Sequence, residues 1–148
     1  MEADLRAYAD RLRLITDTVP LLISYVDKEH RYRFINQTYT EWFGQPQERV
    51  IGKHLSKILG NAAYRSILPE VERALSGEQV IFERSVPYKS GERFIHVNYI
   101  PDFDSATQEV RGFNAFVQDI TESKQSEEAL RRSEEWLRAI FDASRDGI

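Results

Sequence analysis

The 148-residue chain contains no cysteine. This absence excludes disulfide bonds, thiolate metal sites and a cysteine nucleophile. Histidine is scarce as well, and the three that occur, His30, His54 and His96, show no i, i+4 or His-x-His spacing with one another. A zinc or iron site built on histidines is therefore not expected.

Long apolar runs are also missing: none could span a membrane, and the first ten residues contain no signal-peptide core. The 20 basic and 24 acidic residues give a net charge of −4, and no block of Lys and Arg stands out. This balance argues against a nucleic-acid surface. The absence of cysteine is compatible with the cytoplasm, where we expect the protein to work. The 41% of apolar residues is enough for one compact core.

Residues 1–19 are expected to form an amphipathic helix that Pro20 ends. Its apolar residues recur at alternating steps of three and four, the spacing of a heptad seam. The seam consists of Leu5, Tyr8, Leu12, Ile15 and Val19. Such a seam either covers a face of the helix's own domain or meets a second copy in a homodimer, and the pattern leaves both open.

Five strands and several short helices are expected next. Two β-rich runs flank the polar "DKEH", which predicts a hairpin. Asn36 is the expected N-cap of a short helix that Gly44 closes. A longer helix is expected over residues 61–76, with Pro69 bending it or separating its first turn. Three more strands are expected at residues 78–88, 92–100 and 110–119.

This order of elements predicts an α+β domain. We expect a five-stranded antiparallel sheet with short helices on one face, flanked by N- and C-terminal helices. The core should span residues 20–121, and a connecting helix should follow over residues 122–143. On that helix Leu130, Leu137, Ile140 and Phe141 fall on one side, with Trp136 at its edge.

These residues together resemble a PAS domain of the bacterial sensory type. The resemblance covers about residues 10–124 and is carried by "RYRFIN", "WFG", "IGK", "NYIPDFD" and above all "DITESK". The last segment is similar to the DIT motif at which PAS domains end and an output helix begins. The family implies a cavity between sheet and short helices and no enzymatic activity. It also implies a larger signalling protein, such as a histidine kinase or diguanylate cyclase, with its effector domain in the same chain.

The end of the chain repeats its beginning. Residues 136–148 match residues 11–23 at five positions: Leu12/Leu137, Arg13/Arg138, Ile15/Ile140, Asp17/Asp142 and Ile23/Ile148. The offset is about one PAS core plus a connecting helix, so residues 134–148 resemble the start of a second PAS domain.

Strand alternation and family position together propose a lining for the cavity. The candidates are Ile23, Tyr25, Phe34, Trp42, Phe43, Ile51, Leu55, Ile58, Leu68, Val71, Phe82, Val97, Tyr99, Phe113, Ala115 and Val117. Along residues 92–100, Val97 and Tyr99 are expected to face inward and His96 outward. The same apolar residues would also make a filled core with no cavity, so both readings stand.

The cofactor is unknown. Within the PAS family, cysteine-linked flavin and the cinnamoyl chromophore need a cysteine, which the chain lacks. Haem in PAS domains similar to oxygen sensors is held by a histidine on the long helix, and residues 61–76 contain none. Non-covalent flavin stacked on Trp42 stays open beside a plain core role for that residue.

Arg93, Asp119 and Thr121 form the candidate signalling joint. Thr121 is expected to cap the last helix. If residues 92–100 and 110–119 pair as a hairpin, Asp119 falls near Arg93, and an ion pair there would tie the helix to the sheet. The resemblance implies a signalling role for this segment; the alternative is a helix cap alone.

The leading hypothesis is a regulatory module that senses a small ligand or partner and relays the change through its C-terminal helix in a homodimer. A ligand-free dimerisation spacer is the alternative. A small α+β enzyme is less favoured, because it would need a nucleophile and a base side by side.

Overall fold

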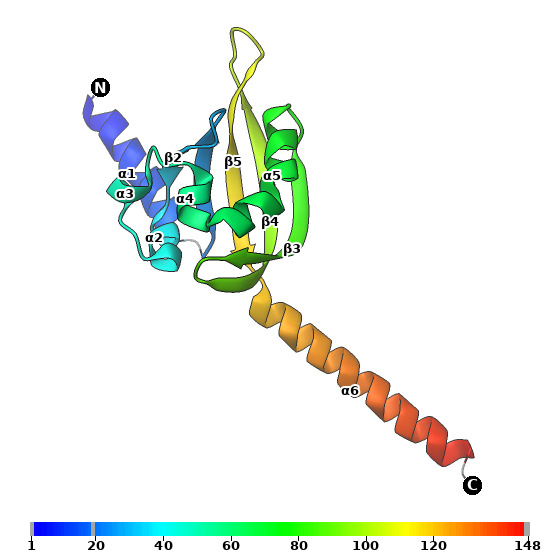
Figure 1. Cartoon of the computed structure of the whole chain (residues 1–148). Helices are drawn as coiled ribbons and strands as arrows, with labels where there is room; N and C mark the ends of the chain where they lie inside the picture. Colours follow the sequence, from blue (N-terminus) through cyan, green and yellow to red (C-terminus); the bar gives the residue numbers. More distant parts are fainter. Residues whose placement is uncertain (1, 19, 147–148) are drawn as a thin grey trace.

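The computed structural model describes residues 2–18 and 20–146. Within them lies a five-stranded antiparallel sheet with the strand order β2-β1-β5-β4-β3. Its strands are β1 (Leu22–Asp27), β2 (Tyr32–Ile35), β3 (Val80–Tyr88), β4 (Gly91–Phe103) and β5 (Val110–Asp119). The helices are α1 (Glu2–Thr18), α2 (Gln37–Phe43), α3 (Gln47–Val50), α4 (Leu55–Leu59), α5 (Asn61–Leu75) and α6 (Thr121–Asp146). Figure 1 shows α2, α4 and α5 on one face of the sheet, which confirms the expected α+β architecture.

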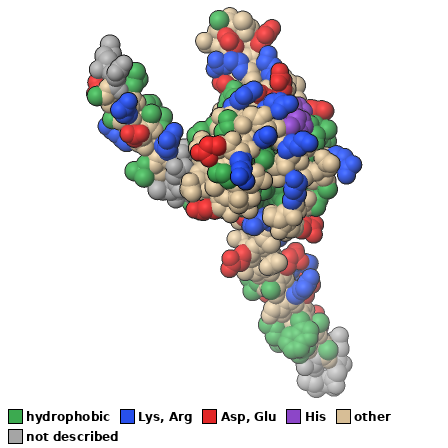
Figure 2. Space-filling view, turned by 60° about the vertical axis from the view of Figure 1, so that its left-hand side comes forward, with side chains coloured by type: hydrophobic (Ala, Val, Ile, Leu, Met, Phe, Trp, Pro, Cys, Tyr) green, Lys and Arg blue, Asp and Glu red, His purple; other side chains and the backbone are tan. Residues whose placement is uncertain are grey.

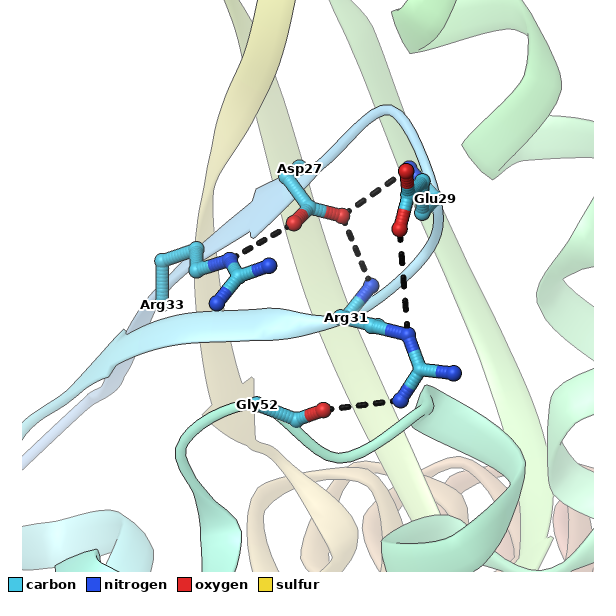
Figure 3. A network of polar contacts seen from close by, with 5 residues as sticks. All are labelled: Asp27, Glu29, Arg31, Arg33 and Gly52. Atoms are coloured by element: carbon cyan, nitrogen blue, oxygen red, sulfur yellow. Dashed lines mark hydrogen bonds and ion pairs between the residues drawn. The ribbon is translucent and has the colours of Figure 1, made fainter.

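The hairpin of β1 and β2 forms around the expected polar turn. The Asp27 carboxylate fixes this turn by accepting hydrogen bonds from the N–H of Glu29 (2.9 Å), the N–H of Arg31 (3.0 Å) and Nε of Arg33 (2.7 Å) (Figure 3). Arg31 also donates to the carbonyl of Gly52 at 2.8 Å. The loop after α3 is therefore attached to the start of β2.

Asn36 caps α2, as the sequence predicts. Its side chain accepts a hydrogen bond from the N–H of Tyr39, accepts another from Ile23 at 3.1 Å and donates to Leu21 at 2.8 Å. Gly44 ends the helix with φ of 65°, the left-handed conformation that glycine adopts without strain. One buried side chain thus joins α2 to the start of β1.

Helix α5 packs along the sheet with one apolar face. Its buried apolar residues are Ala63, Ile67, Val71 and Ala74, which follow the helical period. The helix is continuous through Pro69, so the prediction that this proline separates the first turn is wrong. Arg84 of β3 pairs with Glu70 and donates to the carbonyl of Ser66 at 2.5 Å, which ties β3 to α5.

The core lies between the helices and the inner face of the sheet. On β4 the residues Ile95, Val97 and Tyr99 are buried and face inward, as expected. His96 faces outward, where its Nδ1 lies 3.0 Å from Glu83. Strand β4 continues beyond the expected end at residue 100, because its pairing with β5 extends to Val110.

Gly112 leaves no room for a side chain. A Cβ atom there would lie 2.3 Å from the carbonyl oxygen of Val26 on the neighbouring strand. Strand β1 would have to move away from β5, so we expect Gly112→Ala to lower the free energy of unfolding by about 2 kcal/mol. Urea denaturation checks this, with Gln118→Ala at an exposed position of β5 as the control. Equal stability of Gly112→Ala and the unaltered chain would contradict the strand spacing described here.

Helix α1 precedes the start of β1 and α6 follows the end of β5, and these two strand ends lie side by side, with Leu22 opposite Val117. From there the two helices point in different directions (Figure 1). In residues 2–18 and 20–146, no helix is both long and apolar enough to cross a bilayer.

Candidate functional site

A cavity of about 30 Å³ lies between the inner face of the sheet and helices α2, α4 and α5. It is lined by Leu22, Ser24, Val26, Tyr32, Tyr39, Phe43, Leu55, Leu59, Ile67, Tyr88, Ile95, Tyr99, Phe113, Ala115 and Val117. A space of this size holds about two water molecules and is far too small for a flavin or a haem.

Four buried tyrosines give this cavity its polar character. The hydroxyls of Tyr32 and Tyr39 hydrogen-bond to each other. Within the described part of the chain, the hydroxyls of Tyr88 and Tyr99 make no hydrogen bond. Burial raises the pKa of all four phenols, so they stay protonated at neutral pH. The cavity therefore offers neutral hydroxyl groups to a small polar occupant.

The structure brings only part of the proposed lining together. The candidates that line the cavity are Phe43, Leu55, Tyr99, Phe113, Ala115 and Val117. The candidates that do not are Ile23, Tyr25, Phe34, Trp42, Ile51, Ile58, Leu68, Val71, Phe82 and Val97. Val71 and Val97 are completely buried, so they fill the core instead of bordering the void. Leu68 and Phe34 are only half-buried, because Ile67 and Ile35 beside them take the inward positions.

On β1 the sequence predicted the wrong set of inward-facing residues, Ile23 and Tyr25. Tyr25 lies on the outer face of the sheet, where its hydroxyl donates to Asp102 at 2.6 Å. The residues of β1 that are buried toward the cavity are Leu22, Ser24 and Val26. Three consecutive apolar residues begin this segment, so alternation alone did not fix its phase, and a shift by one residue turns every side chain to the other face.

The cavity tyrosines Tyr32, Tyr39 and Tyr88 were missed by the sequence reading. A signal for Tyr39 was available, because an N-cap at Asn36 places it one turn into α2, toward the core. A signal for Tyr88 was the alternation of β3 from Val80 onward.

The predicted ion pair at the end of the sheet is present. Arg93 Nη1 lies 2.7 Å from Asp119 Oδ2, at the last residue of β5. The other carboxylate oxygen, Oδ1, accepts from the backbone N–H of Thr121 at 3.0 Å and from its hydroxyl at 2.5 Å. The backbone N–H of Phe94 on β4 donates to the same hydroxyl oxygen at 2.8 Å. These contacts fasten the start of α6 to two strands; a role in signalling stays a prediction.

Thr121 is the first residue of α6 and not its cap, which corrects the expected arrangement. Its hydroxyl is already engaged with Phe94 and Asp119, so the Asp119 carboxylate takes over the first N–H of the helix. Partial burial alone would raise the pKa of the Asp119 carboxyl, but the hydrogen bonds from Thr121 and Arg93 outweigh it and lower this pKa. The carboxylate is therefore charged at neutral pH.

Trp42 of α2 connects the joint to the core. The Arg93 guanidinium lies over the Trp42 ring, 4.3 Å from its centroid. The Trp42 ring also packs against Tyr88 in a T-shaped arrangement, with 6.3 Å between the ring centroids, and Tyr88 lines the cavity. Trp42 therefore belongs to a continuous path of contacts from the cavity through Arg93 and Asp119 to α6.

Both terminal helices expose apolar side chains. On α1 these are Leu5, Tyr8, Leu12, Leu14 and Ile15, and on α6 they are Leu130, Trp136, Leu137, Ile140 and Phe141. Figure 2 shows hydrophobic side chains gathered toward the far end of α6. Because the seam residues of α1 are exposed, they do not cover a face of their own domain; Val19 lies outside the described residues. Exposed apolar stripes of this kind favour an interface with another chain.

Among the residues that the structure describes, no group of three or more His, Asp or Glu side chains is arranged to hold a metal ion.

Comparison with known proteins gives consistent matches. A family model described as the PAS fold matches residues 16–125. Over 128 residues the chain is 28% identical to the cell-division control histidine kinase PdhS of Brucella ovis, covering 85% of this chain and 12% of the kinase. The PAS domain of Bordetella pertussis BvgS superposes with a TM-score of 0.63 at 26% identity, covering 87% of this chain and 98% of that one. A PAS domain from Colwellia psychrerythraea shares the fold, with a TM-score of 0.64 at 19% identity over 78% of this chain and 98% of that domain.

Proposed function

This chain belongs to the PAS fold family, and from that premise we propose that it is a regulatory module of a multidomain histidine kinase. It is homologous to a segment of such a kinase, of which it spans only 12%. PAS sensory domains are generally non-catalytic, so the module would act on an effector domain in the same chain and not on a substrate. A diguanylate cyclase is the other effector class that the fold would serve.

The observation that carries this proposal is the contact path from Tyr88 through Trp42, Arg93 and Asp119 to α6. A change in the core that moves Trp42 would displace the Arg93 guanidinium that lies over its ring. Arg93 pairs with Asp119, which anchors the start of α6. Helix α6 has 26 residues, so a small rotation at its base becomes a large displacement at its end, about 39 Å away.

A parallel homodimer completes this mechanism. The apolar faces of α1 and α6 would pair with those of a second copy, so that two α6 helices shift together. The five matches between residues 11–23 and 136–148 support a second PAS domain that begins at about residue 134. We place the module in the cytoplasm, on the side of the kinase's catalytic region.

The input would be a small polar molecule or a protein partner. A ligand can bias the two states of the module only by its difference in affinity for them. The cavity of about 30 Å³ restricts an occupant of this arrangement to the size of about two waters, unless the core opens. The same small volume favours the second candidate function, a ligand-free dimerisation spacer.

A chimeric kinase distinguishes a module that relays a signal from a ligand-free dimerisation spacer. Residues 1–143 are joined through α6 to the catalytic region of a histidine kinase, and autophosphorylation is measured. We expect Arg93→Ala to change the rate at least about fivefold, because a relay couples its states by about 1 kcal/mol or more. Arg111→Ala, which removes the ion pair with Asp102 on the outer face, is the control. An unchanged rate in Arg93→Ala with an intact dimer would leave the spacer as the function.

A further inference from the structure

A second hollow, of about 360 Å³, opens on the outside of the short helices. It is lined by Arg31, Gln45, Arg49, Lys53, His54, Lys57 and Ile58, which we call the basic pocket. Four of these side chains carry a permanent positive charge and none carries a negative one, although the chain as a whole has a net charge of −4. Figure 2 shows Lys and Arg side chains around a histidine on one face of the core.

The basic pocket is held in shape by backbone hydrogen bonds. The N–H of Tyr32 donates to the carbonyl of Lys53 at 3.0 Å, and the N–H of Gly52 donates to the carbonyl of Tyr32 at 2.7 Å. Arg31 is fixed by its bond to the Gly52 carbonyl, as Figure 3 shows. The carboxylate of Glu29 lies 3.9 Å from Nε of Arg31, and Nη1 of the same guanidinium donates to the Gly52 carbonyl.

His54 also lines the basic pocket. Its Nδ1 accepts from the backbone N–H of Ser56 at 3.2 Å, so the neutral ring carries its proton on Nε2. Partial burial, followed by the charges of His30, Arg31 and Lys57, lowers the pKa of this imidazole. The pocket therefore has a positive field that its own side chains do not neutralise.

We propose that the basic pocket binds the diphosphate group of a small phosphorylated molecule, such as a nucleoside diphosphate. Four cations that line one hollow match an anion with two or more charges, and Arg49 can hold two phosphate oxygens at once. The volume lies in the range of small-molecule sites, and Ile58 supplies an apolar wall for the rest of the ligand. An acidic protein segment is the competing occupant, but a single hollow lined by four cations fits a compact anion better than an extended chain.

The position of the pocket makes this binding regulatory. Helix α4 separates it from the tyrosine-lined cavity: Lys57 and Ile58 face the pocket, whereas Leu55 and Leu59 line the cavity. A diphosphate that draws Lys57 and Lys53 together would shift α4 against the core. Binding at the basic pocket, however, does not depend on the proposed relay through α6.

Isothermal titration of the whole chain with pyrophosphate and with ADP tests the site. We expect binding with a Kd below about 1 mM at low salt that weakens as salt is added. The double variant Lys53→Gln/Lys57→Gln should bind at least about tenfold more weakly, because two charge-assisted contacts are lost. The variant Arg65→Gln/Arg132→Gln removes two charges elsewhere and should bind within about twofold of the unaltered chain.

Three results would overturn the proposal. Neither probe binds at 10 mM, or the two double variants weaken binding equally, or a hexaglutamate peptide binds more tightly than pyrophosphate. The last result would assign the pocket to an acidic protein segment. Circular dichroism of the variants shows that each is folded, and all of these outcomes are independent of kinase output in the chimera.

Discussion

Asp119→Ala will leave the PAS core folded but release the start of α6. The carboxylate accepts three hydrogen bonds, one from Arg93 and two from Thr121, and its loss leaves the first N–H of the helix without this partner. Hydrogen bonds to a charged group contribute about 1.5–3 kcal/mol each, and partial exposure of Asp119 reduces this. We expect the amides of Thr121 and Phe94 to exchange hydrogen at least about tenfold faster, which corresponds to about 1.4 kcal/mol of local opening.

The control for this experiment is Asp119→Asn. The amide oxygen can still accept from Thr121, but the ion pair with Arg93 is lost, so its effect should be intermediate. Amides of buried strand residues such as Val97 should keep their protection in both variants. Equal exchange at Thr121 in the alanine variant and the unaltered chain would show that the joint does not anchor the helix.

Lowering the pH should release the start of α6 as Asp119→Ala does. The pKa of Asp119 in the folded chain lies below its ordinary value of 3.8, so the joint contributes stability at pH values above about 4. That contribution is lost as pH falls through the lowered pKa, because the protonated carboxyl no longer pairs with Arg93. Asp119→Asn has no such step, which allows the joint to be separated from general acid unfolding.

Leu137→Lys/Ile140→Lys will dissociate the proposed dimer. These two residues occupy successive seam positions of α6 and are exposed in the single chain, by 57% and 43%. Burying such a side chain contributes about 1.5–3 kcal/mol, and each dimer buries four of them. We expect the dimer Kd to rise at least about 100-fold, which analytical ultracentrifugation measures.

The matched control places two lysines on the outer face of the same helix. Gln125→Lys/Ala139→Lys adds the same charge at exposed positions and should leave the dimer Kd within a few fold. Similar dissociation by both variants would mean that charge, and not the apolar seam, governs association. If the unaltered chain is monomeric at high concentration, the apolar face of α6 is not sufficient to form the dimer.

The sequence predicted the architecture and the joint well, because both depend on local signals. Asn36 as an N-cap, Gly44 as a helix end and the alternation of Val97 and Tyr99 each require only neighbouring residues. The pairing of Arg93 with Asp119 required one further step, the hairpin of β4 and β5, which a short turn makes nearly unavoidable.

The cavity lining was harder to predict because it depends on contacts between segments far apart in the chain. The phase of β1 is set by its pairing with β5, where Ser24 lies opposite Ala115, and no local pattern reports that pairing. Trp42 was assigned to the lining from its position in the family pattern, whereas its place beside Arg93 arises only when α2 folds onto the end of the sheet. The basic pocket could not be predicted for the same reason, since its cations form no block in the sequence. They come from the residue before β2, from α3, from the loop after α3 and from α4.

In the proposed dimer, the joint at Asp119 holds the two cores in a fixed direction on a pair of α6 helices. Because the chain has no cysteine, Glu72→Cys on α5 gives one spin label per core for a double electron–electron resonance measurement. We expect a narrow distance distribution between the two labels of the dimer and a broad one when Asp119→Ala is added, with the dimer still intact. The absence of a label-to-label signal in the Glu72→Cys protein, or the same distribution with and without Asp119→Ala, would rule this arrangement out.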